Sequence, residues 1–336
     1  MKNTPRDDTG SLVQRTERGK KMEFFKQNTK INFMSQRKWA AILSSILFLL
    51  SIISLMVNGL NLGLDFTGGT QVQLNFPYEA NVTKIREDLA AAGFADASVI
   101  NYGTSHDVLV TLSAKKHAQN TAAVSEDAEK EAIVSEITKI IPDAKIQQVD
   151  HIGSQVGKEL ASHGALAVVL ALLGTMIYIA LRFEFRFAVG STVALIHDPI
   201  LILGVFSFFH IEFNLIGLAA VLTVIGYSLN DTIVIFDRVR ENFRRMRKSE
   251  PLEVVNQSIN QTLSRTIMTS ALTLTVVFAL FFLGGSMLHG FSLALIIGIV
   301  VGTYSSIYVA GSLALAMGLN RLHLLPPPKE ALDGRP

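Results

Sequence analysis

Long stretches without charged residues alternate along this chain with short, strongly charged ones. A membrane-spanning helix needs roughly 20 apolar residues, and the runs Trp39–Leu64 and Leu160–Leu181 contain no charge at all. Thr266–Asn320 is also uncharged and is long enough for two helices, with Gly284–Gly290 as the natural break. We therefore predict six spans, at about 39–58, 163–181, 188–209, 213–236, 266–283 and 291–318.

The segment 59–162, between the first two spans, has the pattern of a water-soluble domain. Residues 70–76 alternate in the manner of a strand, and Asn81 caps a helical pattern that Gly93 ends. Two strands joined by a turn at Gly103, a second helix and a final strand follow. The order β-α-β-β-α-β predicts one external α+β domain of the ferredoxin-like type. The later elements are expected at 97–103, 106–112, 125–141 and 144–152.

Composition supports a membrane protein without an obvious enzymatic site. The 336 residues are 49% hydrophobic and only 17% charged, with a mean hydropathy of +0.37. The absence of cysteine excludes disulfides, thiolate nucleophiles and Cys-ligated metals. Neither an ATP-binding loop nor a metal-ligand spacing is present in the sequence. We predict no enzyme activity, no metal and no bound cofactor.

The distribution of Lys and Arg predicts the orientation. Of the 30 basic residues, the first 38 positions hold 10, the loop 182–186 holds 2, the segment 237–265 holds 7 and the positions after 318 hold 3. The turns at 210–212 and 284–290 hold none. The positive-inside rule then places both termini in the cytoplasm and residues 59–162 outside. The first span is expected to remain as an anchor.

The remaining charged segments are expected to meet the membrane surface. The basic segment 1–38 and the tail 319–336 are predicted to be cytoplasmic, with lipid head groups as the partner of the basic residues and no nucleic acid. Within an amphipathic cytoplasmic segment at 237–264, residues 237–250 are predicted to form a helix that lies along the membrane.

Asp231 is the acid that most needs an explanation. It lies six residues, about 9 Å, inside the fourth predicted span. A carboxylate at this depth costs several kcal/mol unless it is protonated, hydrated or paired, so a function is favoured over a side chain that merely reaches the interface. Tyr227, Ser228 and Asn230 are close enough in sequence to solvate it.

Arg265 is the expected counter-charge. It opens the fifth span, with Thr269 and Thr273 on the same helix face. An ordinary cytoplasmic anchor is nearly as good an interpretation, but the depth of Arg265 allows it to pair with Asp231. A pair that protonation breaks is a charge switch of the kind that proton-coupled transporters use.

His197 and Asp198 lie in the middle of the third span, before Pro199. Neighbouring helical residues point about 100° apart, so the two need not bond to each other. Asp198 is either a second protonatable station or a buried structural acid held by a neighbouring helix, and the sequence leaves both open.

Two glycine patterns complete the candidate positions. In GLDFTGG, Gly68 and Gly69 suit a positive φ or a close backbone approach, and Asp65 could cap a helix or bind a cation, although a structural turn is favoured. In the sixth span, Gly298, Gly302, Ser306 and Ala310 recur at four-residue steps, which predicts a seam for close helix packing.

Taken together, four motifs resemble the SecF branch of the SecD/SecF family, in the resistance-nodulation-division superfamily. They are GLDFTGG, IHDP, GYSLNDTIVIFDRVREN and INQTLSRTIMTSALTL, and the resemblance runs from about residue 30. It implies six spans with one external domain, a partnership with SecD around the SecYEG channel, and use of the proton gradient to move unfolded polypeptide. It also implies that the acid and the arginine of the proton path are Asp231 and Arg265.

The function expected from the sequence is therefore a subunit of a proton-driven protein-export machine, with protons as the coupling ion. One alternative is half of a small-molecule exporter of the same superfamily, whose external domain would need an apolar ligand cleft. Another is an assembly factor that only scaffolds its neighbours, for which the charges within the membrane would be dispensable.

Overall fold

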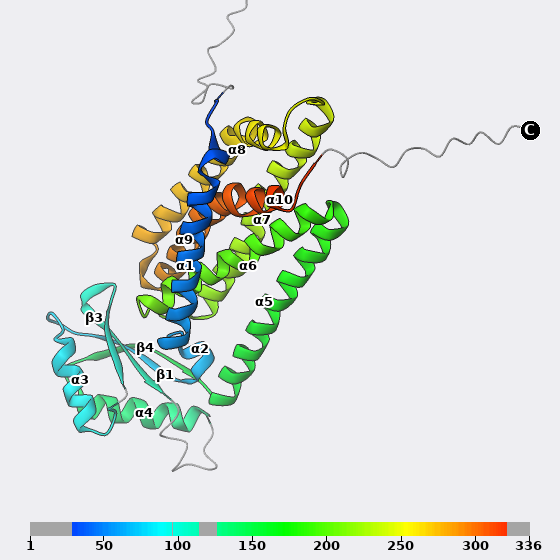
Figure 1. The fold of residues 1–336 in the computed structure, drawn as a ribbon. Helices are drawn as coiled ribbons and strands as arrows, with labels where there is room; N and C mark the ends of the chain where they lie inside the picture. Colours follow the sequence, from blue (N-terminus) through cyan, green and yellow to red (C-terminus); the bar gives the residue numbers. More distant parts are fainter. Residues whose placement is uncertain (1–28, 96, 114–125, 321–336) are drawn as a thin grey trace, which may run out of the picture.

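The computed structural model describes residues 29–95, 97–113 and 126–320, which form a bundle of long helices with a small sheet domain at one end (Figure 1). Six helical segments of this part are long and apolar enough to cross a membrane, as predicted. They are α1 (Arg37–Val57), preceded by the short helix η1 (Phe33–Gln36); α5 (Ser154–Arg182); α6 (Phe185–Phe208); α7 (Leu215–Arg245); α8 (Pro251–Leu283); and a last span built from α9 (Gly285–Ser305), the π-helical η3 (Ser306–Ala310) and α10 (Gly311–Ala316).

Several helices extend beyond the apolar runs that predicted them. Helix α5 begins at Ser154, two residues after the last strand of the sheet domain ends at Ile152, whereas the uncharged run begins at Leu160. Its first turns carry Lys158 and Glu159, so the hydropathy pattern detects only the part at lipid depth. The same continuous helix therefore belongs to both the external part and the membrane part.

The prediction of a separate amphipathic helix at 237–250 is wrong. Helix α7 continues to Arg245 and α8 starts at Pro251, so the segment is the closed end of a helical hairpin. Its apolar residues, including Val239 and Val254, are buried against each other. Asn242 of α7 also donates hydrogen bonds to Ser258 and Gln261 of α8, each at 2.8 Å. The apolar side of the amphipathic pattern therefore reflects packing within the chain.

The sheet domain has the predicted split β-α-β-β-α-β arrangement. Its elements are β1 (Gly69–Asn75), α3 (Val82–Ala91), β2 (Ser98–Tyr102), β3 (Thr104–Ser113), α4 (Glu126–Ile140) and β4 (Lys145–Ile152). The strand order is β2-β3-β1-β4 and every pair is antiparallel. Val72 and Leu74 of β1 pack with Leu89 of α3 and Ile137 of α4, and all four are fully buried. Figure 1 shows both helices on the side of the sheet away from the bundle.

The turn between the membrane and the sheet domain needs its glycines for two reasons. Short helix α2 (Leu64–Thr67) ends at Gly68, where φ is +69°, and Gly69 follows with φ of +136°. Residues that carry a side chain rarely adopt such backbone angles. A Cβ on Gly68 would also lie 2.6 Å from Cα of Ser154, the first residue of α5. Both properties expected of the glycine pair are therefore present at Gly68.

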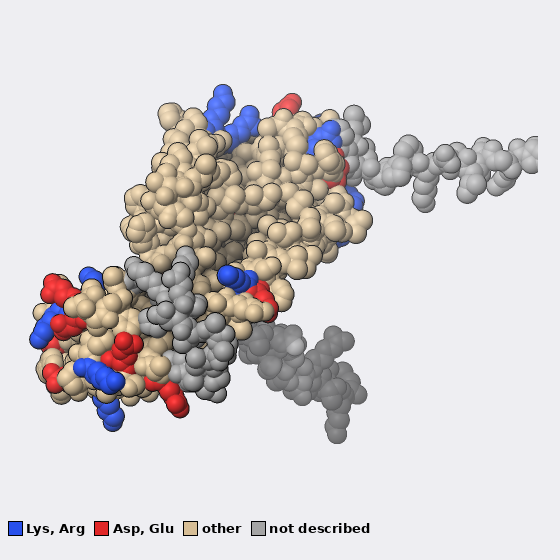
Figure 2. All heavy atoms as spheres, turned by 90° about the horizontal axis from the view of Figure 1, so that it is seen from below, with Lys and Arg blue, Asp and Glu red and all other residues tan. Residues whose placement is uncertain are grey.

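Charged residues are placed as expected for a chain that spans a membrane. In Figure 2, Lys, Arg, Asp and Glu gather over the sheet domain and at the edges of the bundle, while the visible helical surface between them is almost free of charge. Large apolar side chains such as Leu50 of α1 and Leu170 of α5 are more than half exposed on that surface. The hydrocarbon core of a bilayer is the environment that suits this uncharged, apolar helical surface.

The residues before α1 are tied to α8, which no sequence pattern predicted. Asn260 donates to the carbonyl of Ile31 at 2.8 Å and accepts from its N–H at 2.9 Å. One helical turn earlier, Asn256 accepts from the N–H of Met34 at 3.2 Å and donates to the carbonyl of Ile31 at 3.1 Å. The side-chain amides of Asn256 and Asn260, one turn apart on α8, thus bind the backbone of this segment. Met34 of the same segment is buried.

We expect Asn260→Ala to release this segment. The substitution removes two hydrogen bonds to Ile31, each worth about 1 kcal/mol. Limited proteolysis of the purified protein should then cut next to Arg37 several times faster than in the unmodified chain. Asn101→Ala, on the exposed surface of β2 in the sheet domain, serves as the control. Equal cleavage of Asn260→Ala and the unmodified protein would show that these bonds do not hold the segment.

Candidate functional site

Polar side chains from four helices form a layer inside the bundle. Asp198 comes from α6, Ser228 and Asp231 from α7, Ser270 from α8 and Thr303 from α9. Hydrogen bonds link them across helices, and most of the residues are buried. The sequence placed three of these residues in or near a proton path, and the structure brings them into one layer.

Asp231 is a buried acid with an unsatisfied oxygen. Its exposed fraction is 2%, and among the described residues its Oδ2 has no hydrogen-bond partner. Arg265 of α8 and Thr303 of α9 are the groups that interact with its carboxyl. An unpartnered carboxylate oxygen at lipid depth is costly. The site is therefore open to a further donor or to a proton.

Arg265 lies at the level of Asp231 but does not form a direct ion pair with it. Asp231 is 14 residues before the end of α7 and Arg265 is 14 residues after the start of α8, so both lie about 21 Å from the turn that joins the helices. In the described part of the chain, no ion pair within 4.0 Å joins the two residues. The arginine is exposed and acts on the carboxyl through its charge across a longer distance.

Asp198 differs from Asp231 because it is fully held. Its exposed fraction is 0%. Its Oδ2 accepts from Ser228 at 2.5 Å and from Ser305 at 2.8 Å, and its Oδ1 lies 2.9 Å from Nδ1 of His197. The neighbours in sequence do bond to each other. Of the two interpretations, this geometry supports the structural acid, which ties α6, α7 and the last span together. It does not favour a second protonatable station.

The supporting polar residues divide into two groups. The Tyr227 hydroxyl donates to Ser270 at 3.3 Å, and Ser270 lies 2.9 Å from the Thr303 hydroxyl, which makes a path toward Asp231. Asn230 and Thr269 are exposed instead, as Arg265 is, and Thr273 is half-buried. The hydroxyls of Thr269 and Thr273 bond to carbonyls of their own helix.

The small residues of the last span lie against α7. A Cβ on Gly298 would meet Val224 at 2.2 Å, and one on Gly302 would meet Ser228 at 3.0 Å. One turn further, Thr232 donates to Ser306 at 3.0 Å. The π-helical segment begins at this serine. A π-turn inserts one residue into a helix and often marks a functional position, and here it follows Ser305, the partner of Asp198.

A second pair of acids lies outside the spans, where the chain enters the sheet domain. Asp65 Oδ2 accepts from the N–H of Leu215 at 2.8 Å, so it caps the start of α7 from a different element. Phe213 bonds to the backbone of Asn61 and Gly63 in the same place. Burial, and then the nearby Asp65 carboxylate, raise the pKa of Glu212 above its ordinary value. Asp65 thus makes a cap, a role that the sequence left open while favouring a structural turn, and the helix that it caps could not be read from the sequence.

Replacement of Glu212 by Gln should stabilise this junction at neutral pH. A carboxyl with a raised pKa holds its proton longer in the folded state, so its folding contribution is most favourable below the ordinary pKa of about 4.3 and is lost as pH rises through the raised value. The unfolding temperature of Glu212→Gln in detergent should exceed that of the unmodified protein at pH 7.5 and match it at pH 4. Glu136→Gln, on the exposed surface of α4, is the control. A loss of stability at pH 7.5 would mean that the charge of Glu212 is needed.

Sequence reasoning missed three features of this site. The hydroxyls of Ser305 and Thr303 carry no charge and resemble many packing residues, so only their position beside an acid reveals them. Glu212 stands in the six-residue connection between α6 and α7, and its proximity to Asp65 depends on a contact between segments about 150 residues apart. Among the described residues, no group of three His, Asp or Glu side chains could hold a metal ion.

Comparisons with known proteins agree with this geometry. The model of the family "Protein export membrane protein SecD/SecF, C-terminal" matches residues 132–320, and that of the "SecD/SecF GG Motif" matches residues 53–76. The protein translocase subunit SecF of Vibrio alginolyticus is 47% identical over 92% of this chain and 96% of its own length. That of Pseudomonas aeruginosa is 45% identical over 91% and 98%.

A solved structure shows the same fold. The crystal structure of SecDF from Thermus thermophilus, a translocon-associated membrane protein, superposes with a TM-score of 0.76 at 35% identity. The match covers 87% of this chain and 39% of the SecDF chain, so the present chain corresponds to well under half of that protein. The multi-pass fold, the GG turn and the full-length relatives together show that this chain belongs to the SecF family of protein translocase subunits, within the SecD/SecF export proteins of bacteria.

Proposed function

We propose that this Sec export subunit works with SecD as a proton-driven device, in which Asp231 carries the proton and Arg265 is its switching counter-charge. The observation that carries the proposal is the contrast between two buried acids. Asp198 accepts three hydrogen bonds and is held in place. Asp231 has a free oxygen and a cation that acts on it without touching it. Only the second arrangement leaves room for a change of protonation state.

The proton would change the attraction between α7 and α8. When Asp231 is ionised, Arg265 is drawn toward it; when it is protonated, that attraction is lost. Each helix ends at a contact that can transmit a displacement. Helix α7 starts at the Asp65 cap, next to the sheet domain. The proton carrier and the external domain are therefore joined by one continuous helix and one hydrogen bond.

The open side of the bundle supports a membrane partner. Thr223, Gly226 and Asn230 are exposed on one face of α7, and Arg265 is exposed on α8. In the part of the chain that the structure describes, the side chains of Asn230 and Arg265 make no hydrogen bond. Lipid cannot supply one at this depth. A second membrane subunit with polar groups satisfies both, and SecD is the candidate because the longer SecDF chain carries further sequence beyond the part that this chain matches.

The other partners follow from the orientation predicted by the basic residues. With both termini in the cytoplasm, the sheet domain lies on the outer side, where an unfolded polypeptide leaves the SecYEG channel. Protons that enter from that side and leave to the cytoplasm would drive the domain through α7. The chain itself performs no enzymatic step in this scheme and binds no cofactor other than the proton in transit.

A cross-linking experiment tests the partner and the open face together. The chain has no cysteine, so an introduced cysteine is the sole reactive thiol. Asn230→Cys, labelled with a maleimide that carries a photoactivatable benzophenone, should form a cross-link with SecD when the membranes are illuminated. Leu170→Cys, which is 58% exposed on α5, should not. Equal cross-linking of SecD by both variants, or by neither, would contradict the proposed face.

A further inference from the structure

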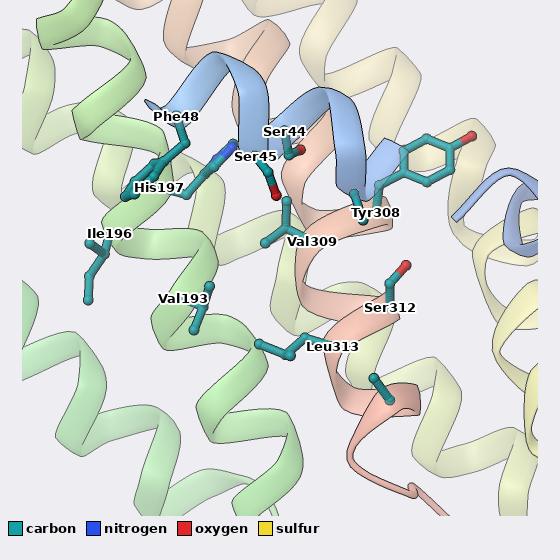
Figure 3. A pocket seen from close by; sticks show the side chains of 12 residues that line it. Ser44, Ser45, Phe48, Val193, Ile196, His197, Tyr308, Val309, Ser312 and Leu313 are labelled. Carbon is teal, nitrogen blue, oxygen red and sulfur yellow. The ribbon is translucent and has the colours of Figure 1, made fainter. Parts of the chain in front are cut away.

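A cavity of about 420 Å³ lies between α1, α6 and the end of the last span (Figure 3). Most of its wall is apolar and includes Phe48, Val193, Ile196, Val309 and Leu313. It extends along the last span from Tyr308 to Ala316, eight residues or about 12 Å. Val193 and Ile196 are each about 40% exposed toward the surface that lipid covers. The bilayer is therefore the source from which a molecule could enter.

Two residues that line this cavity each have a buried polar atom without a partner among the described residues. The atoms are Nε2 of His197 and the hydroxyl oxygen of Ser312. His197 has an exposed fraction of only 5%, so bulk water has little access to its ring. Leaving a buried acceptor or donor unpaired costs about 1–3 kcal/mol. An occupant with a hydrogen-bonding group would remove that cost.

The environment of His197 determines which group is needed. Its Nδ1 lies 2.9 Å from the carboxyl oxygen of Asp198. An ionised carboxylate can only accept a hydrogen bond, so we assign to the ring the tautomer with its proton on Nδ1, which leaves Nε2 as an acceptor. Phe48 stacks on the ring at 6.0 Å with an interplanar angle of 7°, which fixes its orientation. The occupant must donate a hydrogen bond.

We propose that this cavity binds an apolar molecule from the bilayer that carries one hydroxyl group, whose O–H donates to Nε2 of His197. Among the described residues no Lys or Arg lines the cavity, so these residues offer nothing to a phosphate or carboxylate head group. The apolar wall suits a hydrocarbon body, and the unpaired nitrogen suits a single donor. A long-chain alcohol has both features.

Occupation would also reach the polar layer. His197 bonds to Asp198, and Asp198 accepts from Ser228, which is three residues from Asp231 on α7. A ligand that fixes the His197 ring therefore stabilises one arrangement of α6 against α7. This consequence rests on the proposed function of Asp231, whereas binding itself does not.

The test uses a pair of photoactivatable probes on the unmodified chain in phospholipid vesicles. One probe is a diazirine-bearing octanol, and the other is its methyl ether, which keeps the shape but cannot donate. We expect the alcohol to label peptides that contain residues 41–48 and 308–316 saturably, and the ether to bind about tenfold more weakly. Equal binding of the two probes, or labelling that does not saturate, would overturn the proposal.

Two variants complete the test. His197→Phe keeps an aromatic ring and removes the acceptor. The binding affinity of the alcohol should therefore fall about tenfold, and that of the ether should be unaffected. Ser292→Ala removes a buried, unpartnered hydroxyl that does not line the cavity, and the binding of both probes should be unchanged. If His197→Phe binds the alcohol as tightly as Ser292→Ala does, then Nε2 is not the acceptor. Neither outcome depends on whether the chain supports proton-driven export.

Discussion

Replacing Asp231 with Asn is expected to abolish the part of protein export that depends on the proton gradient, while leaving the complex assembled. Asn has nearly the same shape but cannot ionise, so the interaction with Arg265 no longer changes with a proton. In inverted vesicles that contain the export machinery, gradient-stimulated translocation should fall by at least about tenfold. The amount of the subunit that co-purifies with SecD should stay the same.

Asp237→Asn is a matched control for this prediction. It makes the same chemical change on the same helix, six residues further on, in a residue whose ion pair with Arg182 is largely exposed. Exposed pairs contribute little to stability, so export should be normal. Asp198→Asn makes the same change at an acid with three hydrogen bonds, and it should lower the yield of folded protein. Normal gradient-dependent export by Asp231→Asn would remove this residue from the mechanism.

The second large effect is expected for Gly68→Ala. A side chain at φ of +69° costs about 1–2 kcal/mol, and a Cβ placed 2.6 Å from Cα of Ser154 forces the backbone of α5 to move, at a further cost of about 1–3 kcal/mol. We expect a total loss of about 3 kcal/mol in the stability of the junction. Thermal unfolding in detergent, followed by circular dichroism, measures it.

Gly103→Ala separates the two causes. Gly103 has a similar φ of +80°, but a Cβ there would meet nothing within 4 Å. Its replacement should therefore cost only the backbone term, about 1 kcal/mol. If both variants lose the same stability, the close approach of Gly68 to α5 contributes nothing and the turn is needed for its backbone angle alone.

The elements that depend on local pattern could be predicted from the sequence. Alternating apolar residues such as Val72 and Leu74 define a strand wherever it lies, and a run without charge defines a span. The N-cap of Asn81 is present as expected, with its side chain accepting from the N–H of Lys84. A local pattern does not show which surface packs against an apolar helix face. For this reason the pattern of 237–250 predicts a face on the membrane, whereas its apolar residues pack within the helical hairpin.

The candidate site could be predicted from the sequence to a similar extent. The cost of a charge at lipid depth identifies Asp231 and Asp198 without any structure. It does not distinguish a held acid from an unsatisfied one, because that difference depends on Ser228 and Ser305 from other helices. The docking of Ile31 onto Asn256 and Asn260 is equally non-local, since it joins residues more than 220 positions apart.

The most direct test of the account is to observe the protonation of Asp231 while a gradient is applied. Infrared difference spectra of the SecD-containing complex in liposomes should show a protonated carboxyl band that appears when the side bearing the sheet domain is acidified. The band should be absent from Asp231→Asn and retained in Asp237→Asn. A spectrum that does not respond to the imposed gradient, or a band that persists in Asp231→Asn, would contradict the claim that this acid carries the proton.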